Sequence, residues 1–357
     1  MSKILFISNG HGEDLISLRI IQAFTAKNEG NSVFILPMIG EGKIFSKIKN
    51  INIIGPQKET SSGGFVKSIG SLIKDVFSGI LLLHFRQIRN ASKHKYDLVV
   101  CVGDFFPFML SFLFLKYVKI VLISTAKSDL FEPHFWIEFF FLKLAKAIVF
   151  TRDKITADNL VARRVNALFL GNVMMDGLNV KRRNKKENDK FVLGILPGSR
   201  VEAYKNYELI KKVVLVLPAD WVVKVAVSSN MDQSKFMIAE KGELLKMVDF
   251  EELLVDADAV IGLAGTANEQ VIGMGIPLFT FTGYGPQTSK KRFVDQKKLL
   301  GDLPEYICSQ DSGRIAKLIN QKVKDSEFIN RVANEGVKVM GKSGGAEQIS
   351  NELLNLL

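Results

Sequence analysis

The chain has 357 residues, of which 47% are hydrophobic and 24% charged, and its formal net charge is +11. This composition excludes an intrinsically disordered chain, a collagen and a coiled coil. Its length predicts about two domains, each large enough for its own core. Two cysteines, Cys101 and Cys308, do not make a disulfide framework or a Cys-rich zinc site, so we expect a reducing, cytosolic setting. The N-terminal apolar stretch is too short for a signal peptide and predicts a first strand.

Short apolar runs alternate with longer helical patterns along the chain. In the first half they predict strands at 4–7, 33–36, 98–102, 120–123, 147–150 and 168–170. A charged stretch at 176–190 predicts a linker. After it the pattern resumes, with strands at 192–196, 222–227, 259–261 and 278–281. Continuous apolar strands separated by helices are typical of parallel sheets covered on both faces. We therefore predict an α/β fold of two doubly wound domains, 1–175 and 191–343, with a ligand cleft between them.

The basic charge and the aromatic residues concentrate in the first half. Residues 1–180 hold 22 Lys and Arg against 14 Asp and Glu, and 14 of the 26 Phe lie between Phe65 and Phe150. No stretch reaches the roughly 20 apolar residues of a membrane-spanning helix. No recognisable nucleic-acid reading element accompanies the basic charge, so we expect no nucleic-acid partner. A surface of anionic lipid fits the composition better.

One segment of this half has the pattern of an interfacial helix. Apolar residues recur at helical spacing over 65–89, and residues 65–95 hold six Lys and Arg against the single acid Asp75. Such a helix gains binding energy from its apolar stripe and from anionic lipid. A helix packed on a sheet with a solvated basic face fits equally well, and periodicity does not separate the two.

The first candidate motif, residues 8–14, lies between the first strand and a helix predicted at 15–26. Its two glycines permit a tight turn, and a helix start offers N–H donors to an oxygen-rich group. A plain turn with Glu13 and Asp14 as helix N-terminal charges fits equally well. His11 in this loop is placed to titrate or to hydrogen-bond a substrate.

The second motif, residues 196–202, follows the first strand of the second domain. Gly198 opens the turn, Ser199 can donate or cap, and Arg200 can bind a diphosphate or carboxylate in a two-pronged contact. The alternative is a structural turn in which Glu202 pairs with Arg200.

The third motif begins a helix after the strand at 259–261. Its small residues let a phosphate approach the N–H groups: Gly265, Thr266 and Ala267. One turn further, Glu269 or Gln270 can accept hydroxyl groups of a ribose or a sugar. Gln287 and Gln296, after the next strand, can complete a polar wall around the same ligand.

Other chemical patterns are weak. Asp256 and Asp258 form a D-x-D sequence, but it lies where a helix passes into a buried strand, and we expect no metal there. The histidines are scattered and form no zinc set: His11, His84, His94 and His134.

Six segments spread over nearly the whole chain carry a family signature. They are NGHGED at 9–14, VGDFFPF at 102–108, LGNVMMDGL at 170–178, LPGSRVEA at 196–203, GTANEQVIGMGIP at 265–277 and KSGGAEQIS at 342–350. Together they resemble the lipid-A-disaccharide synthase family of glycosyltransferases, and most closely its lipid-A-disaccharide synthase-related members. The resemblance implies the GT-B fold, with a lipid acceptor on the N-terminal Rossmann-like domain and a nucleotide diphosphate on the C-terminal one. It also implies that the last helix, at 344–357, crosses back onto the first domain.

The resemblance further implies an activity. It is an inverting transfer from a UDP-linked acylated glucosamine to an acylated glucosamine phosphate, without metal or other cofactor, on the cytoplasmic face of the membrane. Asp104, Arg200 and Asp14 match an aspartate, an arginine and an aspartate of the family motifs. Two departures concern the substrates. Gln270 replaces a glutamate of the synthases, with Glu269 one residue earlier, and the opening loop differs so that His11 is available for a role.

Our leading hypothesis is therefore sugar transfer from a UDP-sugar to a lipid or glycolipid. Arg200 and the helix start at 265–267 would neutralise the leaving diphosphate. Asp104 is the first candidate for the base, His11 the second, and Asp14 an orienting group. The alternatives are a UDP-N-acetylglucosamine 2-epimerase, which needs no acceptor, and a non-catalytic nucleotide-sugar-binding protein. The sequence leaves the donor sugar and the oligomeric state undetermined.

Overall fold

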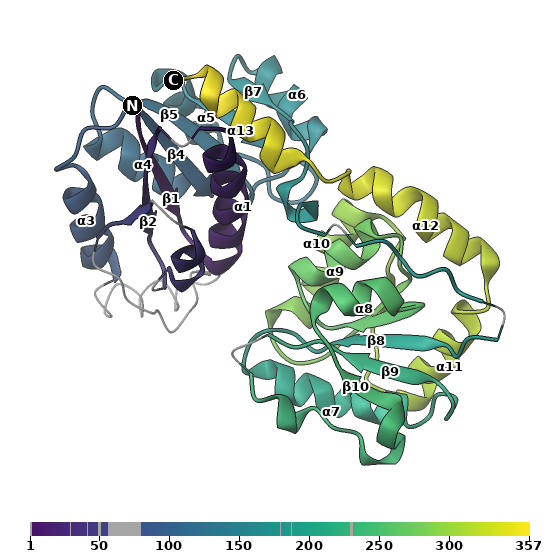
Figure 1. Ribbon diagram of the computed structural model, residues 1–357. Coiled ribbons are helices and arrows are strands. Elements are labelled where there is room, and N and C mark those ends of the chain that lie inside the picture. The colour runs from purple at the N-terminus through teal and green to yellow at the C-terminus, as the bar shows by residue number, and fades with distance from the viewer. Residues whose placement is uncertain are drawn as a thin grey trace. The chain divides into compact units, whose positions relative to one another are not determined.

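The chain folds into two compact units. The structure, a computed structural model, describes residues 2–28, 30–40, 42–48, 51–55, 80–178, 180–186, 188–228 and 231–357. Unit 1 comprises Met1–Asp176 with Gly344–Leu357, and unit 2 comprises Gly177–Ser343. Each unit is built on a parallel sheet with helices on both faces (Figure 1). Within the described ranges, no helix combines the length and apolar character needed to cross a bilayer.

The sheet of unit 1 has seven parallel strands in the order β3-β2-β1-β4-β5-β6-β7. They are β1 (Lys3–Ser8), β2 (Ser32–Pro37), β3 (Ile51–Ile53), β4 (Leu98–Gly103), β5 (Lys119–Ser124), β6 (Ile148–Thr151) and β7 (Asn166–Leu168). The order reverses between β1 and β4, which is where ligands bind in such sheets. Two sequence predictions need correction. The edge strand β3 was not predicted, and β7 ends where the predicted strand at 168–170 would begin.

Helices cover both faces of this sheet because its strands alternate between two cores. Ile4 and Phe6 of β1 belong to one core, and Leu5 and Ile7 belong to the other. The first core contains α1 (His11–Lys27) and α13 (Gly345–Asn355), with the short helices η1 (Lys43–Lys47) and η2 (Val173–Met175) nearby. The second contains α3 (Ile80–Ala91), α4 (Phe105–Phe114), α5 (Trp136–Leu144) and α6 (Lys154–Ala162). Of the predicted interfacial helix at 65–89, residues 65–79 lie outside the described part of the chain.

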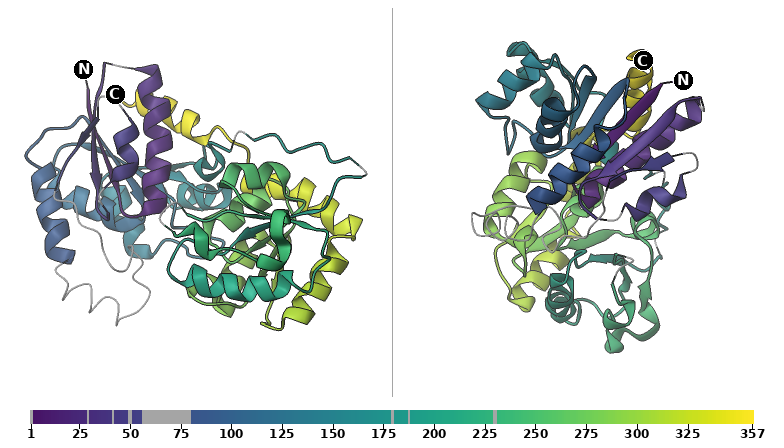
Figure 2. Two further views of the ribbon diagram at one scale, coloured as in Figure 1. Left: turned by 60° about the horizontal axis from the view of Figure 1, so that its bottom comes forward. Right: turned by 90° about the vertical axis from the view of Figure 1, so that its left-hand side faces the viewer.

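The last helix returns to unit 1, as the family resemblance implied, and α13 lies beside α1 (Figures 1 and 2). The Asp176 carboxylate fixes its start by accepting hydrogen bonds from the backbone N–H groups of Gly344, Gly345 and Ala346. A Cβ atom on Gly345 would lie 2.9 Å from the carbonyl carbon of Gly171, so the close approach requires glycine. An aspartate at a helix N-terminus also stabilises the helix dipole. Two of the six family segments therefore meet in this contact.

Unit 2 repeats the architecture with six parallel strands in the order β10-β9-β8-β11-β12-β13. They are β8 (Val192–Leu196), β9 (Val222–Val225), β10 (Leu245–Met247), β11 (Ala259–Gly262), β12 (Leu278–Phe281) and β13 (Glu305–Ile307). Its helices are α7 (Glu202–Val214), α8 (Phe250–Asp256), α9 (Thr266–Gly273), α10 (Lys290–Leu300), α11 (Ser312–Lys322) and α12 (Ser326–Met340), with η3 (Gln233–Lys235), η4 (Ala239–Leu244) and η5 (Pro286–Thr288). The three-residue edge strands β10 and β13 were not predicted. The order reverses between β8 and β11.

One helix boundary differs from the sequence prediction. Helix α1 begins at His11 rather than near residue 15, because Gly10 adopts the extended conformation of an N-cap. Glu13 and Asp14 therefore lie in the first helical turn and not in a loop. This placement directs the two carboxyl groups back toward the carboxyl end of β1, since side chains on a helix lean toward its N-terminus.

Candidate functional site

The carboxyl edge of the unit 1 sheet places Asp104 between β4 and α4. Asp104 is the N-cap of α4, and its Oδ1 accepts a hydrogen bond from the Phe106 N–H at 2.8 Å. The Asn9 amide, from the loop after β1, lies against Gly103, where a Cβ atom would be 1.9 Å from the amide oxygen. The loops that follow β1 and β4 thus meet directly beside Asp104.

Two further carboxyl groups reach this edge from α1. Ser8 Oγ donates to Asp14 Oδ1 at 2.5 Å, and Asp14 is only 3% exposed. Burial raises the pKa of Asp14 to about 7, the Ser8 hydrogen bond lowers it, and the neighbouring Glu13 raises it. Burial also raises the pKa of Glu13, and the charge of Asp104 adds to that increase. Glu13, Asp14 and Asp104 are thus electrostatically coupled, and protons are held there more tightly than on ordinary carboxylates. His11 is the first residue of α1, and its side chain is outside the described part.

Sequence reasoning missed a buried polar chain at the end of β5. Ser124 Oγ lies 3.1 Å from His134 Nε2, and His134 Nδ1 lies 2.6 Å from Glu138 Oε2. The other oxygen of Glu138 lies 3.7 Å from Lys127 Nζ, which is also 3.6 Å from Glu132 Oε1. The available signal was the sequence at the start of α5, where His134 directly precedes the N-cap Phe135 and Glu138 lies in the first turn.

Charged residues of this polar network change the pKa of Asp104. Burial is the main cause that raises the pKa of Asp104. The hydrogen bond from Phe106 and the charge of Lys127 lower the pKa, while Glu138 and Glu132 raise it. The edge therefore combines a raised carboxyl pKa with the charge of Lys127, so that Asp104 holds a proton more tightly than an ordinary aspartate does.

In unit 2, the LPGSR loop follows β8 and is tied to the loop after β12. Asn206 of α7 donates from its amide to the carbonyl oxygens of Pro197 and Tyr284, both at 3.2 Å, and its Oδ1 accepts from the Tyr284 N–H at 2.7 Å. Gly198 has a φ of +113°. Ser199 and Arg200 are exposed at the tip of this loop. Asn206 was not singled out in the sequence, although it positions both loops.

The start of α9 lies at the same edge. Gly265 is its N-cap, Thr266 is exposed and Ala267 is half-buried. The Gln287 side chain lies against Gly265, with its oxygen 3.1 Å from the position of a Cβ atom there. Arg292 Nε donates to this oxygen at 3.1 Å. Because the first N–H groups of a helix have no partner within the helix, this start can bind an anion.

The residues predicted to bind sugar hydroxyls are buried behind the helix start. Glu269 Oε1 lies 3.5 Å from Arg292 Nη2. Gln270 and Gln296 are also buried. The structure thus brings Glu269 and Gln287 together through Arg292, a residue that sequence reasoning missed. The positively charged start of α10 (KKR) was its only sequence signal.

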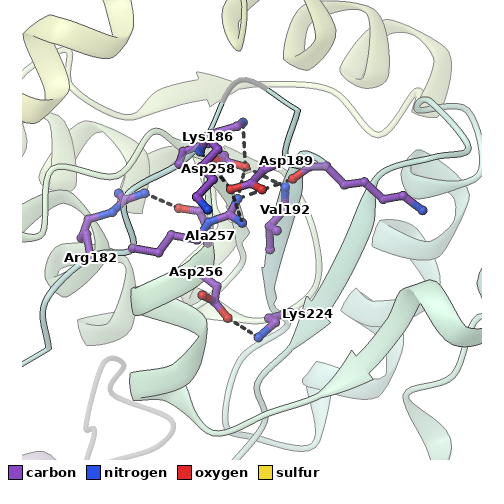
Figure 3. Close-up of polar contacts among 11 residues, drawn as sticks. Arg182, Lys186, Asp189, Val192, Lys224, Asp256, Ala257 and Asp258 are labelled. Carbon is purple, nitrogen blue, oxygen red and sulfur yellow. Dashed lines mark hydrogen bonds and ion pairs between the residues drawn. The ribbon is translucent and has the colours of Figure 1, made fainter.

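The D-x-D sequence has protein partners in unit 2 (Figure 3). Asp256 forms an ion pair with Lys224, and Asp258 pairs with Arg183 at 2.9 Å and Lys185 at 3.0 Å. The Val192 N–H also donates to Asp258 at 2.8 Å. Hence Arg183 and Lys185 of the charged stretch are held by the residue that precedes β11. Among the described residues, no three His, Cys, Asp or Glu side chains group as metal ligands would.

Unit 1 exposes an unusual apolar groove on α5. It has a volume of about 540 Å³ and is lined by Trp136, Phe139, Phe140, Lys143, Leu144 and Arg163. Trp136 is 78% exposed, and Phe140 and Leu144 are each 57% exposed. Two of the lining residues, Lys143 and Arg163, are basic and exposed. We call this set of residues the α5 groove.

No protein-family model matches the chain, and no curated protein matches its sequence. Solved structures do match its fold. The calicheamicin glycosyltransferase CalG4 is 14% identical, with a TM-score of 0.65 over 100% of this chain and 98% of that one. MurG from Acinetobacter baumannii is 12% identical (TM-score 0.65; 99% and 100% covered), and a UDP-GlcNAc 2-epimerase from Neisseria meningitidis bound to UDP-GlcNAc is 13% identical (TM-score 0.57; 99% and 100%). At such identities the likeness shows the fold alone, and that fold is GT-B, two Rossmann-like parallel-sheet domains, as the sequence predicted.

Proposed function

We propose that this protein is an inverting glycosyltransferase that transfers a sugar of the N-acetylglucosamine type from a UDP-sugar to a lipid or glycolipid. One observation carries the proposal. Two units whose first six strands share one order present different groups at their carboxyl edges: Arg200 and the start of α9 in unit 2, which we call the basic edge, and carboxyl groups with raised pKa values in unit 1, which we call the acidic edge. A sugar transfer needs both, a cationic cradle for a leaving diphosphate and a base for an acceptor hydroxyl.

The donor would bind to unit 2. Arg200 and the N–H groups at the start of α9 would hold the diphosphate, with Gly198, Ser199, Gly265, Thr266 and Ala267 allowing close approach. Gln287, beside the helix start, would bind hydroxyl groups of the ribose or the sugar, whereas Glu269 and Gln270, predicted for the same role, lie buried behind it. Preorganised donors of this kind stabilise the charge that develops on a leaving group. No metal ion is required in this scheme, because the guanidinium and the helix dipole supply the positive charge.

The acceptor would bind to unit 1. Asp104 would accept the proton from its hydroxyl as that oxygen attacks the anomeric carbon, and Asp14 would orient it. Because attack occurs opposite the leaving UDP, the configuration of the sugar inverts. His11 is the second candidate for the base.

The α5 groove supports a lipid acceptor and a peripheral position at a membrane. Exposed aromatic residues beside lysine and arginine are suited to an anionic bilayer, since aromatics insert at the interface and each basic residue adds about 1 kcal/mol near the surface. A contiguous apolar surface of this kind is uncommon on a protein with no partner for it.

The test of the reaction is sugar transfer into lipid. The protein is incubated with UDP-N-acetylglucosamine and a membrane lipid extract, and the lipids are analysed by mass spectrometry. A new glycolipid that is absent with the Asp104→Asn variant supports the proposal. UDP binding without any product across the extract would overturn it in favour of a non-catalytic nucleotide-sugar-binding protein.

Membrane binding by the α5 groove is tested by sedimentation with vesicles of phosphatidylcholine, with and without phosphatidylglycerol. The Trp136→Ser/Phe140→Ser variant should lose binding roughly 100-fold or more, because each of the two buried side chains contributes about 1.5–3 kcal/mol. The matched control is Val216→Ser/Val294→Ser, which removes two apolar side chains that are each 57% exposed on unit 2. Equal binding of the parent and both variants would exclude the α5 groove as the membrane contact.

A second candidate function is a UDP-N-acetylglucosamine 2-epimerase, because several of the matching structures are described as such enzymes. This reaction takes place on one nucleotide sugar without an acceptor. Incubation with UDP-N-acetylglucosamine alone, followed by analysis for the 2-epimer, separates the two functions. The α5 groove would have no role in the epimerase reaction.

A further inference from the structure

The surroundings of Asp104 disfavour its ionised form, which is the form that can act as a base. The titratable groups around it are Glu13 from α1, Lys127 and Glu132 from the loop after β5, and Glu138 from α5. On the α3 side, the ring of His84 packs against Phe106, with centroids 5.5 Å apart. Burial and the charges of Glu138 and Glu132 favour the protonated form of Asp104, which cannot accept a proton. A cation at this point is needed to oppose them, and Lys127 supplies it.

The backbone places Lys127 over the end of β4. Ser124 is paired in register with Gly103, the residue before Asp104. The Thr125 N–H donates to the carbonyl oxygen of Gly103 at 3.1 Å. The loop therefore leaves β5 tied to the strand that ends at Asp104. Lys127 follows two residues later and is almost fully buried, with 7% of its side chain exposed.

A chain of contacts then fixes the Lys127 side chain. His134 bridges Ser124 and Glu138, and its side chain is fully buried. The Phe135 N–H donates to the same Glu138 oxygen that contacts His134, at 3.3 Å. This leaves the second oxygen of Glu138 directed at Lys127, whose ammonium also lies 4.4 Å from the centre of the Phe135 ring.

Such a buried ion pair contributes little to stability. Removing an ammonium and a carboxylate from water costs several kcal/mol each, which their attraction repays only in part. A well-packed pair of apolar side chains would hold the loop equally firmly. The arrangement is therefore better explained by what the charge of Lys127 does to its surroundings than by what it adds to folding.

We propose that Lys127 is a positioning residue for Asp104, and that the Ser124, His134 and Glu138 chain holds its ammonium where it keeps the Asp104 carboxylate ionised and ready to accept the acceptor's proton. This inference rests on the proposed function for its meaning, but the charge coupling can be measured without any substrate.

The experiment is a pH titration of the Asp104 carboxyl carbon by NMR, with the signal assigned from its loss in Asp104→Asn. In Lys127→Met the midpoint should move to higher pH, because the cation that favours the ionised form is gone. Lys127→Arg should restore the parental midpoint. Ser124→Ala should move the midpoint in the same direction by a smaller amount, because the Lys127 ammonium remains but its position is less well fixed. Lys116→Met, which removes an exposed lysine between α4 and β5, is the control and should leave the midpoint unchanged.

The same variants are then assayed for transfer. Below the midpoint, activity of Lys127→Met should fall about tenfold, the effect of one nearby charge, and recover toward the parental value as pH rises. An unchanged midpoint in Lys127→Met overturns the proposal. A shift in Lys127→Met but none in Ser124→Ala overturns the role of the chain. If Asp104→Asn transfers sugar at the parental rate, the proposed function fails instead, and the NMR result still decides the coupling.

Discussion

The carboxyl edges of the two sheets share a topology and differ in chemistry. In unit 1 the segments after β1 and β4 bring Glu13, Asp14 and Asp104 together, with raised carboxyl pKa values. In unit 2 the segments after β8, β11 and β12 bring Arg200, the start of α9 and the Arg292 contact with Gln287 to the corresponding edge. Strand order therefore sets the edge at which a ligand can bind, while a few residues after each strand decide the charge of that edge.

The most severe test of the acidic edge is Asp104→Asn. Loss of a positioned base typically lowers a rate by about 10²–10⁴, so sugar transfer should nearly cease. UDP affinity, measured by calorimetry, should not change because the donor residues are on unit 2. Asp158→Asn, which removes an exposed aspartate of α6, serves as the control. A variant with full turnover would remove Asp104 from the reaction.

The pH dependence of folding tests the burial of Asp14. Its pKa of about 7 in the folded protein exceeds the ordinary value of 3.8, so the folded state binds a proton that the unfolded state releases. The resulting stabilisation is present below about pH 4 and is lost as pH rises through about 7, by up to about 4 kcal/mol. Asp14→Asn keeps an acceptor for the Ser8 hydroxyl and should abolish this pH-dependent loss of folding stability.

Urea unfolding of the parent and of Asp14→Asn at several pH values measures the effect. The unfolding free energy of the parent should fall relative to that of the variant between pH 4 and pH 8. If the unfolding free energies of the parent and the variant change with pH in parallel, the Asp14 carboxyl has its ordinary pKa in the folded protein.

The basic edge is tested by Arg200→Ala. A hydrogen bond to a charged group contributes about 1.5–3 kcal/mol, so UDP affinity should fall roughly 10- to 150-fold and turnover should fall with it. Arg314→Ala, an exposed arginine of α11, controls for net charge. Undiminished UDP binding would show that the diphosphate is not held by the LPGSR loop.

Arg292→Gln should have the smallest effect. Arg292 already contacts Gln287 and Glu269, so a ligand must compete with these contacts, and we expect UDP affinity to fall only about 2- to 10-fold. Calorimetric titration of Arg292→Gln and Arg200→Ala with UDP, carried out in parallel, ranks the two losses of affinity. A larger loss for Arg292 than for Arg200 would reassign the main cation of the edge.

The sequence predicted most of the strands because each buried strand is a continuous apolar run. The missed strands β3, β10 and β13 are three-residue edge strands, with too few buried residues to form a pattern. The candidate loops were found for a related reason. Each follows a predicted strand directly, and parallel strands present all their carboxyl ends at one edge. What the loops bind remained a matter of residue type alone.

The sequence by itself determined two parallel-sheet units and the position of their ligand edges, since these depend on local hydrophobic patterns and turn residues. Only the tertiary structure decided which side chains share those edges. Asn206 joins a residue 78 positions away, and Asp176 holds a helix start 170 positions away. His134 connects the end of β5 to Glu138 of α5, whose other oxygen lies 3.7 Å from Lys127. Such contacts depend on the closure of long chain segments, which no local periodicity encodes.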